Sequence, residues 1–205
     1  MTILDIFILG GPLMYVLLAL SFFALGIIIA KYRQVFKIIG IHKQLTKKIA
    51  VEESIEGINK VVKEYGNTCP LSVVLSKAAS LLDEDYALIK DSIEASANLS
   101  IHKMEGGMGW LSTISAVAPL VGFLGTVTGM VKVFMNIAAH SQNGIDITYL
   151  SSGIWEALLT TVGGLIVGIP AIMFYNDLVT HIENTAKLLQ EQIDDFLIRH
   201  RREQR

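Results

Sequence analysis

The chain has 205 residues, of which 52% are hydrophobic, and a mean hydropathy of +0.51. This composition is too apolar for an ordinary soluble domain. The formal net charge of −2 gives no electrostatic reason to expect a nucleic-acid partner, and the single cysteine, Cys69, cannot form an internal disulfide.

Three apolar segments are long enough to cross a bilayer core, which needs about 20 helical residues. The first ends at Ala30, and residues 1–30 comprise the N-terminus and this span. The second covers residues 108–137 and contains Lys132, and the third covers residues 152–176 and contains Glu156. Because backbone groups in lipid must bond internally, each segment predicts a transmembrane helix.

The distribution of basic residues predicts the orientation of these spans. Residues 1–30 and the connection 138–151 contain no Lys or Arg, whereas residues 31–107 carry eleven. The tail, residues 177–205, carries five more. The positive-inside rule therefore places the N-terminus and residues 138–151 outside, and both basic regions in the cytoplasm. A cleavable signal peptide is the alternative for the first segment, but the chain lacks the basic stretch that would precede it.

The cytoplasmic region 31–107 is predicted to be helical. Ile55, Ile58 and Val62 recur at helical spacing, residues 66–70 read as a turn, and residues 71–82 form a second apolar-periodic stretch. A third helix is expected to begin at Asp83 or Asp85 and to run on into the second span, with Leu88, Ile89, Ile93 and Ala97 on one face. Residues 177–205 predict a C-terminal helix. We expect these stripes to pack on one another, with the arginine-rich end contacting anionic lipid heads as a minority interpretation.

No catalytic or metal motif is evident. The five histidines are scattered, none in a metal-binding spacing, and no glycine-rich loop ends in Gly-Lys-Ser or Gly-Lys-Thr. We therefore expect neither enzymatic activity nor a metal or cofactor.

The second and third spans contain glycines at three- and four-residue spacing. Small residues let transmembrane helices approach closely, so helix packing is the expected role. A proline also lies near the predicted cytoplasmic end of each span, where a bend is tolerated. The candidate packing residues are Gly122, Gly125, Gly129, Gly163, Gly164, Pro119 and Pro170.

Joining these spans by a short external connection makes them antiparallel, which fixes the residues at equal depth. Thr126 then lies level with Thr161 in mid-membrane, and Lys132 lies level with Glu156 nearer the outside. Helical phase places Glu156 and Thr160 on a different stripe from Thr161. If the two threonines face a common lumen, that lumen is otherwise apolar.

Such a lumen would conduct ions poorly alone, but it suits another apolar helix that carries its own carboxylate. An ionisable group at membrane depth is costly, so Glu156 is itself a functional-site hypothesis. Its carboxylate could pair with Lys132. Alternatively, the lysine reaches the outer interface, where it could meet the partner or a lipid phosphate.

Residues 118–130, A-P-L-V-G-F-L-G-T-V-T-G-M, and residues 153–171, G-I-W-E-A-L-L-T-T-V-G-G-L-I-V-G-I-P-A, carry a resemblance. Together they resemble the signature of the MotA/TolQ/ExbB proton channel family, in its three-span ExbB and TolQ branch and most like ExbB. Thr126 and Thr161 match the family's pore threonines, and Glu156 matches its third-span glutamate. With Thr160, these are the candidate proton-pathway residues.

The resemblance implies an all-α membrane protein that assembles as a homo-oligomeric ring, a pentamer in this branch. It implies a multi-pass protein of the bacterial inner membrane, without cofactor, that surrounds an ExbD-like or TolR-like single-span partner with a transmembrane aspartate. Ion transport would energise a TonB-type protein for outer-membrane transport. The alternatives are a TolQ-type role with a TolA-type protein in envelope integrity, a self-sufficient ion channel, and a passive helical scaffold.

Overall fold

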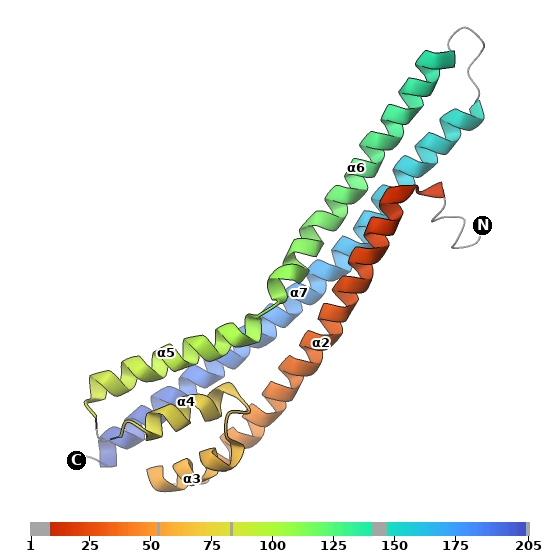
Figure 1. Cartoon of the computed structure of the whole chain (residues 1–205). Coiled ribbons are helices and arrows are strands. Elements are labelled where there is room, and N and C mark those ends of the chain that lie inside the picture. Colours follow the sequence, from red (N-terminus) through yellow and green to blue (C-terminus); the bar gives the residue numbers. More distant parts are fainter. Residues whose placement is uncertain (1–8, 53, 83, 141–146, 204–205) are drawn as a thin grey trace. The chain divides into compact units, whose positions relative to one another are not determined.

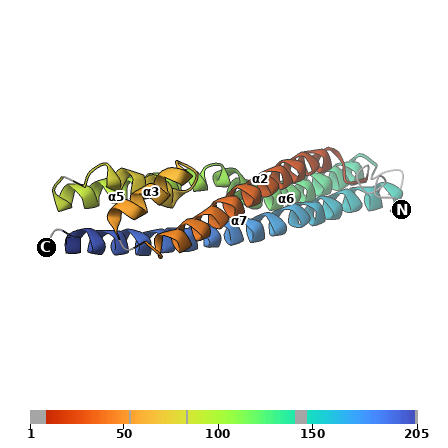
Figure 2. The ribbon, with the colours of Figure 1, turned by 90° about the horizontal axis from the view of Figure 1, so that it is seen from below.

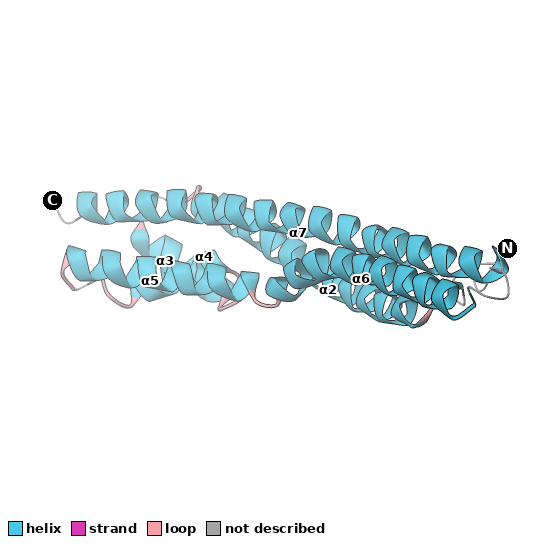
Figure 3. Cartoon of the chain, turned by 90° about the horizontal axis from the view of Figure 1, so that it is seen from above, coloured by secondary structure: helices cyan, strands magenta, loops and turns pink. Residues whose placement is uncertain are grey.

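The computed structural model describes residues 9–52, 54–82, 84–140 and 147–203. Residues 1–8, and residues 141–146 of the predicted external connection 138–151, lie outside the described residues. Throughout the described ranges, all regular secondary structure is helical (Figures 1 and 3). The helices are α2 (Pro12–Ile49), α3 (Ile55–Tyr65), α4 (Pro70–Ala79), α5 (Tyr86–Glu105), α6 (Met108–His140) and α7 (Ile147–Glu203).

The chain divides into two compact units. The first contains residues Met1–Ile29 and Gly107–Asn176, and the second contains residues Ala30–Gly106 and Asp177–Arg205. The division falls within α2 and within α7, so each of these helices has one end in each unit. The first unit therefore holds the beginning of α2, all of α6 and the first half of α7.

Three helices, α2, α6 and α7, are long and apolar enough to cross a membrane. Their parts in the first unit expose large apolar side chains, such as Phe22 (68% exposed), Leu120 (64%) and Ile166 (66%). Water would penalise such surfaces, whereas lipid or a second protein covers them at no cost. The three predicted spans are therefore confirmed as helices suited to lipid.

Glycines bring α6 and α7 into backbone contact in the first unit. A methyl group added at Gly122 would lie 2.8 Å from the Thr160 carbonyl oxygen, and one at Gly164 would lie 2.6 Å from the Ala118 carbonyl oxygen. Contacts this close to backbone leave no room for a side chain. Gly163 differs, because it faces Met14 of α2 instead of α6.

The second unit packs α3, α4 and α5 on the end of α2 and the end of α7 that belong to this unit. Ser54 caps α3 by accepting a hydrogen bond from the Gly57 amide, and Pro70 begins α4, where its missing N–H is not needed. One buried cluster joins these helices, contributed by Leu45 and Ile49 of α2, Ile58 of α3, Leu75 of α4, Ile89 and Ile93 of α5, and Leu189 and Ile193 of α7. The apolar stripes of the sequence therefore pack on one another as expected, except that Leu88 of α5 is exposed and lies outside this cluster.

The expected continuous helix from the cytoplasmic region into the second span was wrong. The helix α5 ends at Glu105 and α6 begins at Met108, with Gly106 and Gly107 between them. Gly107 has a φ of +84°, a left-handed conformation that L-residues rarely adopt. The Gly-Gly pair therefore ends one helix and starts the next. Pro119 and Pro170, in contrast, both lie inside continuous helices.

Candidate functional site

Two threonines at equal depth meet between α6 and α7. The hydroxyl oxygens of Thr126 and Thr161 are 3.2 Å apart, so the level predicted from antiparallel spans is present in the structure. Both side chains are half-buried in the single chain. They approach because Gly122 lets the α6 backbone lie directly on the α7 backbone, and the Thr161 hydroxyl donates to the Gly122 carbonyl at 3.1 Å.

The hydrogen bonds of this hydroxyl pair leave acceptor capacity unused. Each hydroxyl has one proton and two lone pairs. The Thr126 hydroxyl lies 2.7 Å from the Phe123 carbonyl, which can take its proton, as the Gly122 carbonyl can take that of Thr161. The two hydroxyls therefore keep lone pairs that can accept a hydrogen bond from another molecule. A hydroxyl can donate to another molecule only if it breaks its hydrogen bond to the backbone carbonyl. Such a pair can meet either form of a carboxylic acid.

The surface around the hydroxyl pair is apolar and exposed in the single chain. Phe123 is 63% exposed and Leu158 is 55% exposed, on the turns of α6 and α7 that flank the threonines. The same surface also includes the exposed side chains of Val127, Met130, Ile154 and Leu165. We call this surface the threonine face. Its chemistry is that of an apolar wall with a single hydroxyl level, as the sequence predicts.

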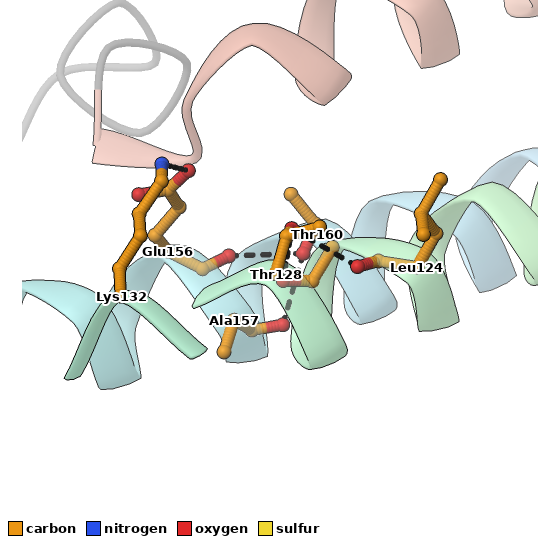
Figure 4. A network of polar contacts seen from close by, with 7 residues as sticks. Leu124, Thr128, Lys132, Glu156, Ala157 and Thr160 are labelled. Atoms are coloured by element: carbon orange, nitrogen blue, oxygen red, sulfur yellow. Dashed lines mark hydrogen bonds and ion pairs between the residues drawn. The ribbon is translucent and has the colours of Figure 1, made fainter. Parts of the chain in front are cut away.

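The second polar level is an ion pair. The Lys132 ammonium lies 2.6 Å from the Glu156 carboxylate and joins α6 to α7 (Figure 4). The glutamate side chain is 19% exposed, whereas that of the lysine is 53% exposed. The pairing that equal depth suggested is therefore present within one chain.

A third element closes over this pair. Gly11, with a φ of +71°, precedes α2, and a methyl group added there would lie 2.3 Å from a Glu156 carboxylate oxygen. The turn before the first span therefore packs directly on the ion pair. Motif reasoning missed Gly11 because the contact joins segments about 145 residues apart and leaves no periodic signal. The Gly-Gly-Pro run at the start of the first apolar span is the sequence signal that could have indicated a turn at this position.

Thr160 lies apart from the threonine face. Its side chain is 1% exposed, and its hydroxyl donates within α7 to the carbonyl oxygens of Glu156 and Ala157, at 2.9 and 3.0 Å (Figure 4). A methyl group at Gly125 would fall 2.1 Å from its hydroxyl oxygen, so this threonine fills the space that the glycine leaves. The structure thus places one candidate pathway residue inside the helix interface.

The remaining candidates all lie at helix contacts, except one. Gly129 faces Ala157 and Gly153, and Pro119 faces Gly168. Pro170 is exposed. Among the described residues, no group of three or more His, Cys, Asp or Glu side chains could hold a metal ion.

Comparison with known proteins agrees with this geometry. The model of the MotA/TolQ/ExbB proton channel family matches residues 67–191, which include α6, the hydroxyl pair and the ion pair. The chain belongs to this family.

Individual relatives place it in the ExbB/TolQ branch. The chain is 30% identical over 198 residues to the biopolymer transport protein ExbB-like 1 of Synechocystis sp., a match covering 95% of this chain and 74% of that protein. It is 33% identical over 117 residues to TolQ of Haemophilus influenzae, covering 56% of this chain and 50% of that protein. A third match, 42% identical over 73 residues to ExbB of Salmonella typhimurium, covers 36% of this chain and 29% of that protein.

These findings and the three apolar helices make the chain a multi-pass membrane protein of the ExbB/TolQ type. The chain spans 74%, 50% and 29% of the lengths of these three relatives, and the family match itself lies at residues 67–191. That region contains the threonine face and the Lys132–Glu156 pair.

Proposed function

We propose that this chain is the ring subunit of a proton-motive-force-driven complex in the bacterial inner membrane. Several copies, five by analogy with the ExbB branch, would surround single-span partner helices of the ExbD type. The complex would transmit energy to a TonB-type protein, and the chain would have no enzymatic chemistry of its own. The observation that carries the proposal is one hydroxyl pair on an otherwise apolar, exposed face of α6 and α7.

The threonine face fits a partner helix better than an open aqueous pore. An aqueous pathway needs a continuous series of polar groups, whereas Phe123 and Leu158 flank the hydroxyls with apolar surface. A second apolar helix would bury this surface. Its carboxylate would then find hydrogen-bonding groups only at the level of Thr126 and Thr161.

The hydroxyl pair can serve both states of such a carboxylate. A protonated acid donates a hydrogen bond to a free lone pair of either threonine, and an ionised acid accepts a hydrogen bond from a hydroxyl that rotates away from its carbonyl. An uncompensated charge at this depth costs about 2.5–3.5 kcal/mol on insertion scales. The threonines would lower that cost while the partner exchanges its proton, and we propose that the exchange drives rearrangement of the partner against the ring.

The ion pair has a different role in this proposal. Lys132 holds the Glu156 carboxylate and Gly11 covers it, so this carboxylate acts as a tether among three helices instead of a proton relay. With the N-terminus outside, the tether lies toward the outer end of the spans, beyond the level of the hydroxyl pair.

Removal of the hydroxyls tests the proposal. We expect Thr126→Ala and Thr161→Ala together to lose most proton-driven, partner-dependent transport while the complex still assembles, with loss expected to be about 10-fold or more because a charged hydrogen bond contributes about 1.5–3 kcal/mol. Thr128→Ala is the matched control, because the Thr128 hydroxyl donates to the Leu124 and Gly125 carbonyls of its own helix. Full transport by the double variant would refute the role of the threonine face.

A TolQ-type role is the second candidate, favoured by the match to the Haemophilus influenzae TolQ over more than half of this chain. The chain would then energise a TolA-type protein for envelope integrity. Complementation of strains lacking either system, scored as outer-membrane transport or as detergent resistance, separates the two roles.

A further inference from the structure

The second unit contains a groove that the proposed function does not use. It lies between α2 and α7 and has a volume of about 430 Å³. Its lining residues are Ile39, His42, Lys43, Thr46 and Lys47 of α2 with Thr185, Leu188 and Gln192 of α7. We call it the α2–α7 groove.

Two polar side chains that line this groove carry buried atoms with unused hydrogen-bonding capacity. His42 is only 4% exposed, and neither of its ring nitrogens has a hydrogen-bond partner among the described residues. The Thr46 hydroxyl is likewise without a partner there. Burial also lowers the pKa of His42, which favours the neutral ring with one donor and one acceptor nitrogen. Buried polar groups in native proteins are normally satisfied, so these atoms mark the groove wall as incompletely packed in the single chain.

The position of the groove argues against a lipid as that occupant. His42 lies twelve residues beyond Ala30, where the apolar run of the first span ends. At about 1.5 Å per residue, this is about 18 Å farther along α2. Lys43 and Lys47 at the groove instead favour an apolar surface that also carries a carboxylate.

The outer stripe of α5 has this chemistry. Leu88 and Leu99 are 48% and 56% exposed, although they lie in the unit that packs the cytoplasmic helices. Between them on the same stripe are Asp91 and Ala95, both exposed. This stripe lies almost opposite the buried α5 stripe of the core, so it faces away from its own chain.

The groove and the α5 stripe occupy different sides of the unit at the same level. On α2 and α7, the groove residues lie about 100° around each helix from the residues of the buried cluster, while α3 and α5 lie on the cluster side (Figure 2). The Lys31 ammonium donates to the Met104 carbonyl, which sets the relative level of α2 and the antiparallel α5. Twelve residues after Lys31 on α2 is Lys43, and twelve residues before Met104 on α5 is Ser92. Lys43 therefore lies level with Ser92, next to Asp91.

We propose that the α2–α7 groove of one copy receives the outer α5 stripe of a second copy of this chain. The contact joins two different surfaces that lie at one level along α2, and rotation about an axis parallel to α2 keeps both at that level, which is what a closed ring requires. Leu88 fills the groove, while Asp91 meets Lys43 or Lys47. This inference rests on the proposed ring function and adds the cytoplasmic interface to it.

Photo-crosslinking in membranes tests the contact directly. A benzophenone amino acid replaces Leu88 in the full-length chain, and a mixture of isotopically light and heavy copies identifies intermolecular products. We expect crosslinks from this position to residues 39–47 of another copy. Intermolecular crosslinks to other segments, or an oligomer without any, would overturn the interface but leave the proposed function intact. A chain that stays monomeric in the presence of its single-span partner protein would overturn both the interface and the proposed ring function.

Charge exchange gives a second measurement. Asp91→Lys and Lys43→Asp should each weaken association of the copies by about fivefold per contact, and the double variant should restore it. Glu191→Lys, the same charge change on an exposed α7 position, is the matched control and should leave association unchanged. Equal weakening by the single and double variants would contradict the pairing.

Discussion

The Lys132–Glu156 ion pair gives the sharpest stability prediction. We consider Glu156→Gln, Lys132→Met and the variant with both changes. The carboxylate is mostly buried and the two charged atoms are 2.6 Å apart, which is a strong, charge-assisted geometry. The lysine side chain, however, is 53% exposed, so solvent or lipid head groups screen part of the interaction.

The structure sets the expected size of this coupling between two limits. Exposed ion pairs contribute about 0.2–1 kcal/mol, and breaking a fully buried pair costs about 3–5 kcal/mol. Because one partner is buried and the other half-exposed, we expect a coupling energy of about 1–2 kcal/mol. The single variants should each lose more than this coupling, since each leaves a charge or amide without its partner.

The assay is a double-mutant cycle on the free energy of unfolding, measured in lipid bicelles by denaturant titration. In this cycle, the double variant should be more stable than the sum of the two single losses predicts. Strictly additive losses would show that the two side chains do not interact, and the tether among three helices would then have to be abandoned.

Three further predictions concern stability. Gly164→Ala should destabilise the α6–α7 contact by about 1–3 kcal/mol, because the added methyl group meets the Ala118 backbone. Gly26→Ala is the control, because a methyl group there meets no atom within 4 Å. Equal effects of the two variants on thermal unfolding would contradict the close approach of the helices. Gly11→Ala should cost about 1–2 kcal/mol from its left-handed φ alone, plus displacement of the Glu156 carboxylate; a variant as stable as the parent would show that this turn does not cover the pair. Ser54→Ala should cost about 0.5–2 kcal/mol by removing the α3 cap, checked by hydrogen exchange at the Gly57 amide, where unchanged protection would argue against the cap.

The sequence was sufficient to predict the three spans and the two polar levels between α6 and α7. Run length and charge define the spans, and the constant depth of antiparallel partners brings Thr126 to Thr161 and Lys132 to Glu156. These features follow from local pattern and from one short connection, so they need no tertiary information.

Other features depend on contacts that no periodicity encodes. The Gly106–Gly107 break was missed because the apolar stripe of α5 remains in phase close to the second span, while backbone freedom ends the helix. Gly11 over Glu156 and the unsatisfied His42 are consequences of how distant segments meet. Thr160 shares a stripe with Glu156 in the sequence, but its burial follows from a contact between helices, in which its side chain packs against the Gly125 backbone.

The central claim is that the threonine face receives a partner helix, and contact at this face tests it most directly. A photoreactive amino acid in place of Phe123, beside the hydroxyl pair, should crosslink in the assembled complex to the partner's single span near its acidic residue. Capture of lipid alone at this position, in a complex that retains the partner, would contradict the account.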